Sequence, residues 1–599
     1  MRSRTDRRRI RRTRPPRQDG DETCGTSGWE HRAGWCDLTR RHAPRRASIR
    51  VSRLLNEDGL GFRKACVRQT TNSFPLHYNC RMSQNMPPDV PSLVRLGHAY
   101  TRRGEYLRAT EAFTGAIDLE PTDADLYFFR ANAFAAAGRY PDSLADFTRA
   151  IDLRPDYSAA YHNRATAQVD AGELEAAIPD FTRAIELTPE DADPLNGRAA
   201  VYSRLKNYDA AYADYEAAIK LDPHTFRTYF NRANAYSVQE RHEEAIADYT
   251  EALLINPRHS RAYVYRGLSL EALGKLDAAI TDLSTALRLT PTATDAFWHR
   301  ARLWADLGEH EKAVADFNWV LKLDPKHVGA LNLRGVALAE LKRHDKAIAD
   351  FTAAMKLDPT DSAPVFNRGL SHIRIKNLDA AVADFTEAIH INPDDPSGFI
   401  QRGYAYHELH DSERAVADFT EAIRLKPESS RAYFARAMAH RRAQNWHAAL
   451  ADITEAIERN PKSDAALNLR ASLHYRLGDY RAALADHVAA WELDPEDAAT
   501  LNHMAWLRAT CPLDEVRDGA AAVRDASQAC ELSEHKAPGY IDTLAAAHAE
   551  TGNFEEAIRW QEKAIELVSA EQKSDYETRL ELYKAGQPYR DVAEKTDPI

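Results

Sequence analysis

The sequence is poor in the residue types on which many enzymes and secreted scaffolds depend. Glycine accounts for only 25 of 599 residues and cysteine for only six. So little glycine argues against glycine-rich phosphate loops, and six cysteines are too few for a disulfide-based fold of this length. Because no apolar run approaches the roughly 18 residues that a membrane helix needs, we expect no membrane span.

Sequence motifs of catalysis are missing as well. His407-Glu408-Leu409-His410 resembles the zinc motif HExxH, but its two histidines have the wrong spacing to share one helix face. The chain has no CxxC pair, no phosphate-binding P-loop and no nucleophile elbow. We therefore expect no enzyme activity, no metal, no cofactor and no small-molecule substrate.

The charge is unevenly distributed along the chain. Residues 1–81 carry 20 basic and 8 acidic groups, a net of +12, whereas the remainder carries a net of −23. Segment 1–89 is Arg-rich, and it lacks both apolar periodicity and the apolar core of a signal peptide. Three interpretations stay open: a misassigned start upstream of Met82, a disordered tail, or a basic arm that binds nucleic acid.

From residue 90 the sequence repeats with a period of 34 residues, marked by twelve prolines from Pro121 to Pro495. We number the 34 positions of each unit from its first residue, so that position 1 of the first unit is Val90. Position 8 is Gly or Ala in all twelve units, and positions 20 and 27 are each Ala in eleven. Positions 20, 24 and 27 share one helix face, and the proline at position 32 ends that helix. This pattern predicts that each unit is a helical hairpin. Such a hairpin must stack on its neighbours to bury its apolar face.

This pattern resembles the tetratricopeptide repeat in its bacterial form. The resemblance implies an all-α fold, a right-handed α-solenoid superhelix of about 14 antiparallel hairpins. The residues of the first unit that match the signature are Leu93, Leu96, Gly97, Tyr100, Ala109, Phe113 and Pro121.

The units divide the chain into segments. Residues 90–497 hold the twelve in-phase units, and 498–571 hold two further units, the first with a six-residue insertion. Residues 572–599 form a capping helix and tail. Cys511 and Cys530 lie in the first of the two divergent units, where they either pack side by side as apolar residues or form a redox-linked pair.

One pair of charged positions changes together. Position 7 is Arg and position 23 is Asp in every unit from the second to the twelfth, and both are replaced in the first and thirteenth. The residues are either solvated charges kept through duplication, or an ion pair packed between the two helices of one hairpin. Their joint loss favours the ion pair, for which Arg is well suited. The pairs that we single out are Arg232–Asp248, Arg300–Asp316, Arg334–Asp350 and Arg368–Asp384.

The resemblance also implies where a ligand binds. In this family the first helices line a concave groove, with positions 2, 5, 9 and 12 facing it; Trp506 occupies position 9 of the thirteenth unit. Aromatic rings at these positions either contact a ligand or pack between neighbouring helices. The candidates are Phe128, Asn132, Phe230, Asn234, Trp298, Arg302, Phe366, Tyr404, Phe434 and Arg441.

The function implied by the resemblance is a non-enzymatic scaffold or adaptor that binds peptides or partner proteins in this groove. The acidic array makes nucleic acid an unlikely partner. The alternative is a regulator whose basic N-terminal arm binds nucleic acid while the repeats bind protein. Since neither a signal peptide nor a membrane span is found, we expect a cytoplasmic protein.

Overall fold

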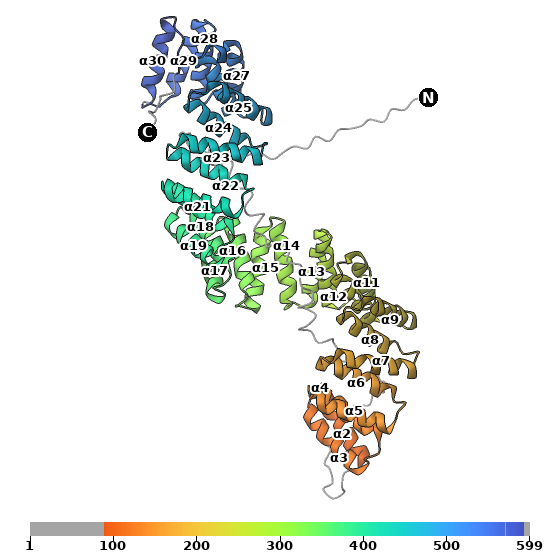
Figure 1. The fold of residues 1–599 in the computed structure, drawn as a ribbon. Coiled ribbons are helices and arrows are strands. Elements are labelled where there is room, and N and C mark those ends of the chain that lie inside the picture. Colours follow the sequence, from red (N-terminus) through yellow and green to blue (C-terminus); the bar gives the residue numbers. More distant parts are fainter. Residues whose placement is uncertain (1–88, 570, 592–599) are drawn as a thin grey trace, which may run out of the picture. The chain divides into compact units, whose positions relative to one another are not determined.

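The computed structural model describes residues 89–569 and 571–591, and all regular structure in these ranges is helical (Figure 1). The basic segment and Met82 lie outside the described residues, as does the end of the tail. The described chain divides into two units, up to Asp452 and from Ile453 onward, which we describe separately. The predicted α-solenoid of about fourteen hairpins is confirmed.

The N-terminal unit is a succession of helical hairpins. Its first helices are α2 (Val90–Arg103), α4 (Ala124–Ala136), α6 (Ser158–Ala171), α8 (Ala192–Arg204), α10 (Phe226–Val238), α12 (Ser260–Ala272), α14 (Thr294–Asp306), α16 (Val328–Glu340), α18 (Ser362–Arg374), α20 (Pro396–Glu408) and α22 (Ser430–Arg442). Its second helices are α3 (Tyr106–Leu119), α5 (Tyr140–Leu153), α7 (Leu174–Leu187), α9 (Tyr208–Leu221), α11 (His242–Ile255), α13 (Leu276–Leu289), α15 (His310–Leu323), α17 (His344–Leu357), α19 (Leu378–Ile391), α21 (Ser412–Leu425) and α23 (Trp446–Arg459), within which the unit ends.

The C-terminal unit continues with three hairpins and one further helix. The elements are α24 (Asp464–Arg476), α25 (Tyr480–Leu493), α26 (Ala498–Thr510), the 3-10 turn η2 (Asp514–Val516), α27 (Gly519–Leu532), α28 (Pro538–Glu550), α29 (Phe554–Leu567) and α30 (Lys573–Lys584). Arg579 of α30 donates to the buried Asp542 of α28 at 2.8 Å, which holds α30 against the last hairpin.

Small residues at position 8 let the two helices of a hairpin approach each other. In the hairpin of α16 and α17, a Cβ atom built on Gly335 would lie 2.6 Å from the ring of Phe351, the residue at position 24. Gly97, Gly369 and Gly403 meet their own position-24 rings at similar distances. The aromatic ring of each hairpin therefore fills the space that the small residue leaves.

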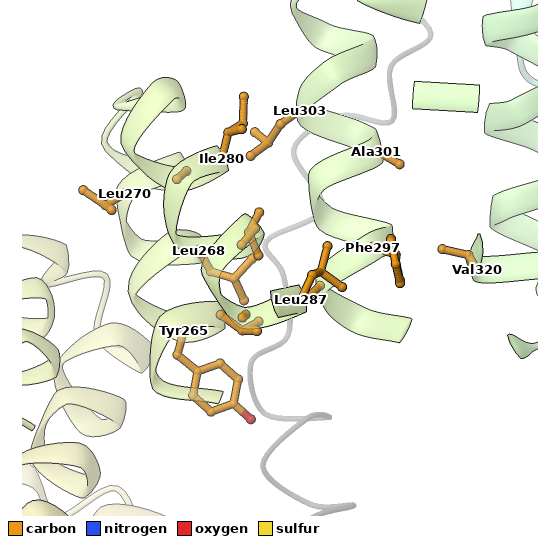
Figure 2. Close-up of a cluster of buried hydrophobic side chains, with 14 of the residues drawn as sticks. Tyr265, Leu268, Leu270, Ile280, Leu287, Phe297, Ala301, Leu303 and Val320 are labelled. Carbon is orange, nitrogen blue, oxygen red and sulfur yellow. The ribbon is translucent and has the colours of Figure 1, made fainter. Parts of the chain in front are cut away.

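The apolar core consists of several clusters, many of which join side chains of neighbouring hairpins. The largest cluster joins side chains of α10 to α16, and Figure 2 shows part of it, with Leu268 of α12, Ile280 of α13 and Leu303 of α14 among the labelled residues. Phe317 and Leu283, which belong to the same cluster, are completely buried. Each hairpin thus covers the apolar face of the next, as expected for a stack of repeats.

Every first helix of the N-terminal unit is followed, at position 15, by a residue with a left-handed backbone. Glycine occupies this place in five of the hairpins, including Gly274 and Gly308, with φ of 72° and 77°. In the other six it is a residue with a side chain, such as Lys342 and Lys376, with φ of 58° and 60°. The turn is therefore set by the stacking of the helices rather than by glycine alone.

The two described cysteines are free and buried, and they lie in separate core clusters. Cys511 packs with Tyr480 and Val516, whereas Cys530 packs with Ile541 and Leu544. Neither the side-by-side packing nor the redox-linked pair is found, because Cys511 follows the end of α26 and Cys530 lies near the end of α27, at opposite ends of an antiparallel hairpin. Burial raises the pKa of the Cys530 thiol to about 11, so this thiol is unreactive at neutral pH.

Candidate functional site

From the second to the twelfth hairpin, the first and second helices are joined by an ion pair between positions 7 and 23. In the hairpin of α16 and α17, Arg334 Nε donates to Asp350 Oδ2 at 2.7 Å and Arg334 Nη2 donates to Asp350 Oδ1 at 2.6 Å. Only 22% of the Arg334 side chain and 10% of the Asp350 side chain are exposed. Nη1 of the same guanidinium donates to Asn318 Oδ1 of the preceding hairpin at 2.7 Å.

This arrangement recurs along the array. All eleven Arg–Asp pairs, from Arg130–Asp146 to Arg470–Asp486, are bidentate, with donor–acceptor distances of 2.6–3.0 Å. In nine of them the guanidinium also donates to the side chain at position 25 of the preceding hairpin, which is Thr, Ser or Asn. We call this set the arginine ladder.

The hydrogen bond from the guanidinium to position 25 of the preceding hairpin was not predicted from the sequence, although a sequence pattern indicates it. Thr follows Asp-Phe or Asp-Tyr in many second helices, for example Thr352 after Phe351. Thr352 Oγ1 accepts from Arg368 Nη1 at 3.0 Å, so the guanidinium of Arg368 connects two hairpins. The hydrogen bonds to Asp raise the pKa of arginines such as Arg130 above the ordinary value, so the ladder stays charged and serves packing.

The aromatic residues at position 5 lie in the wedge between the two helices of their own hairpin. Ring centroids of Phe128, Phe230, Trp298 and Phe366 lie 5.5–5.9 Å from the ring at position 24 of the same hairpin. A second ring, at position 34, covers three of them: Tyr157 over Phe128, His259 over Phe230 and His327 over Trp298. Contacts within the array therefore cover much of the surface of the position-5 rings.

Phe366 is the clearest correction to the predicted set. Only 8% of it is exposed, so it belongs to the core rather than to a ligand-binding surface. Its neighbour Val365 is completely buried, and both pack in one cluster with Phe385. Phe128, Phe230, Trp298 and Phe434 remain half-buried and keep part of their rings at the surface.

The side chains at position 9 contact neighbouring first helices or their own second helix. Asn132 Oδ1 accepts from Asn163 Nδ2 of the next hairpin at 2.9 Å, and Asn234 Oδ1 accepts from the Tyr249 hydroxyl at 2.6 Å. Arg302 Nη2 lies 3.7 Å from Glu271 Oε1 of the preceding first helix. Burial raises the pKa of Glu271.

The remaining candidates lie toward the end of the N-terminal unit. The Tyr404 ring packs edge-on against Phe419 at 5.3 Å, and the guanidinium of Arg431 lies over the Tyr404 ring at 5.5 Å. Arg441 is half-buried on α22. The candidates are thus distributed over successive first helices, and the structure does not bring them together in one pocket.

Within residues 89–569 and 571–591, no group of His, Cys, Asp and Glu side chains is arranged to hold a metal ion. In the same part of the chain, no helix has both the length and the apolar character needed to cross a bilayer.

Models of one family, described as the tetratricopeptide repeat, match most of the array. The matched residues are 94–158, 158–191, 192–225, 226–259, 299–362, 365–395, 400–446, 434–498 and 539–568. Comparison with curated proteins gives no match.

Several solved structures are similar to parts of this chain. Yeast Tom70 is 18% identical over 75% of this chain and 96% of its own, with a TM-score of 0.32. A tetratricopeptide repeat protein from Parabacteroides merdae is 20% identical over 42% of this chain and 98% of its own, with a TM-score of 0.34. YrrB, described as having an unusual peptide-binding site, is 28% identical over 31% of this chain and 95% of its own, with a TM-score of 0.29. On the evidence of its repeat period, its stacked hairpins and the family matches, the chain belongs to the tetratricopeptide repeat family.

Proposed function

We propose that this protein is a non-enzymatic scaffold that binds extended peptide segments of partner proteins on the first helices of its hairpins. The observation that carries the proposal is the set of half-buried rings at position 5, of which Phe230 and Trp298 are examples. Phe230 and Trp298 each pack against the ring at position 24 of their own hairpin, so little rotamer entropy is lost when a ligand covers the exposed part. Asn132 and Arg302 add polar groups on the same helices.

The hairpin of α14 and α15 offers a matched pair of tryptophans for the test. Trp298 lies on the first helix, and Trp319 lies on the second helix with 44% of its surface exposed. Partners are captured with the full-length chain and with the variants Trp298→Leu and Trp319→Leu. We expect Trp298→Leu to lower partner recovery at least fivefold and Trp319→Leu to leave it unchanged.

A second variant separates ligand binding from packing, because Trp298 also contacts Phe317 and His327. Arg302→Ala removes a half-buried charge on the same helix without opening the ring wedge. Helix content measured by circular dichroism confirms that each variant is folded. Equal recovery by the wild type and by the Trp298 and Arg302 variants would show that the first helices are not the binding surface.

A further inference from the structure

The chain that follows α30 returns to the first helices of the C-terminal unit. Asp591 N donates to the carbonyl oxygen of Thr510, the last residue of α26, at 2.9 Å. Arg590 Nη1 lies 2.7 Å from Glu550 Oε2, at the end of α28. Residues 589–591 thus contact the first helices of two successive hairpins.

The carboxylate of Asp591 is held by two neutral donors. Its Oδ2 accepts from Trp506 Nε1 at 2.6 Å and from the Tyr475 hydroxyl. Trp506 and Tyr475 occupy positions 9 and 12 of their hairpins, which are groove-facing positions in this family. Burial and the hydrogen bond to Asp591 both raise the pKa of Tyr475, so its hydroxyl remains a donor over the physiological pH range.

The two preceding residues of the segment have their own contacts. The Glu550 carboxylate that meets Arg590 also accepts from Arg517 Nε at 2.8 Å, and 14% of the Glu550 side chain is exposed. The Tyr589 ring lies 5.8 Å from the Trp506 ring and beneath the guanidinium of Arg579 at 5.5 Å. An aromatic, a basic and an acidic side chain in sequence therefore each meet a complementary group.

We propose that this surface, formed by Tyr475, Trp506, Thr510, Glu550 and Arg579, is a peptide-binding site that the chain's own segment 589–591 occupies until a partner replaces it. The partner is an extended protein segment with an aromatic, a basic and an acidic residue in that order. The site deepens the proposed function and rests on it. Since the internal segment is tethered, its effective concentration is about millimolar, and a partner must bind well enough to compete with it.

The test uses full-length protein and a fluorescent peptide with the sequence of residues 585–595. In the variant Tyr589→Ala/Asp591→Ala the internal competitor is weakened, and we expect the peptide to bind at least tenfold more tightly than to the wild type. Adding Trp506→Phe, which keeps an aromatic ring but removes the N–H donor, should reverse most of this gain. A peptide with Asn in place of Asp591 should bind no variant well.

Two outcomes would overturn the proposal: no gain in peptide affinity in the double variant, or the same affinity with and without Trp506→Phe. Either result would identify 589–591 as a structural cap. If the double variant does not fold, Asp591→Asn in the full chain provides the same comparison. The outcome is independent of the Trp298 experiment, which concerns the N-terminal unit, so failure of this site is distinguishable from failure of the proposed function.

Discussion

At the scale of single residues, the arginine ladder is the feature that most clearly joins sequence to stability. Each guanidinium satisfies one carboxylate of its own hairpin and, in nine hairpins, one side chain of the preceding hairpin. Because the pairs are bidentate and little exposed, removing one partner destabilises the fold: the other charge is left buried without its partner.

We expect Arg334→Ala to destabilise the hairpin of α16 and α17 by about 3–5 kcal/mol, since Asp350 would lose both of its guanidinium hydrogen bonds. Native-state hydrogen exchange of the α16 and α17 amides measures this loss as a fall in their opening free energy. The effect should be confined to this hairpin and its neighbours, because contacts in the stack are local.

The chain supplies the control for that experiment. The first hairpin has Leu96 and Ala112 in place of the pair, so Arg334→Leu combined with Asp350→Ala reproduces a natural apolar solution. We expect the double variant to lose much less stability than Arg334→Ala, because no buried charge remains unpaired. Additive losses in the double-mutant cycle would mean that the two residues do not act as a pair.

At the scale of the helical elements, the turn at position 15 shows how stacking overrides local preference. A left-handed backbone costs a residue with a side chain roughly 1–2 kcal/mol, yet six hairpins of the N-terminal unit adopt it there without glycine. Packing of the hairpin must supply that free energy.

Lys342→Gly should therefore stabilise the protein by about 0.5–1 kcal/mol, since relief of the left-handed strain exceeds the extra chain entropy of glycine. Lys342 is exposed and has a φ of 58°. The reciprocal change Gly308→Ala, at φ 77°, should destabilise by a similar amount. Urea unfolding midpoints give both values, and a loss of stability in Lys342→Gly would contradict the explanation.

The hairpins themselves could be predicted from the sequence, but part of the site could not. The 34-residue period and the small residues at positions 8, 20 and 27 determine which faces meet, because only small residues permit that approach. The sequence does not show whether a ring at position 5 lies at the surface or in the wedge. Phe366 is buried and Trp298 is half-buried, although both occupy the same position of the repeat.

The position of residues 589–591 could not be predicted from the sequence, for a different reason. Residues 589–591 have no periodicity, and their placement depends on single contacts such as the one between Asp591 and Trp506. Local patterns specify repeated packing well, whereas a segment that binds once leaves no repeated signal.

At the scale of the whole molecule, the net charge of −11 combines a basic N-terminal segment with an acidic array. The array is built of similar hairpins whose first helices differ in their outward side chains. A scaffold of this kind gains specificity by varying those side chains while the packing positions stay the same.

The most direct measurement is hydrogen–deuterium exchange of the full-length protein with and without a partner captured in the Trp298 experiment. We expect added protection in first helices such as α10, α12 and α14, with little change in α11, α13 and α15. Protection confined to the second helices would contradict the account, because the partner would then bind the opposite side of the hairpins.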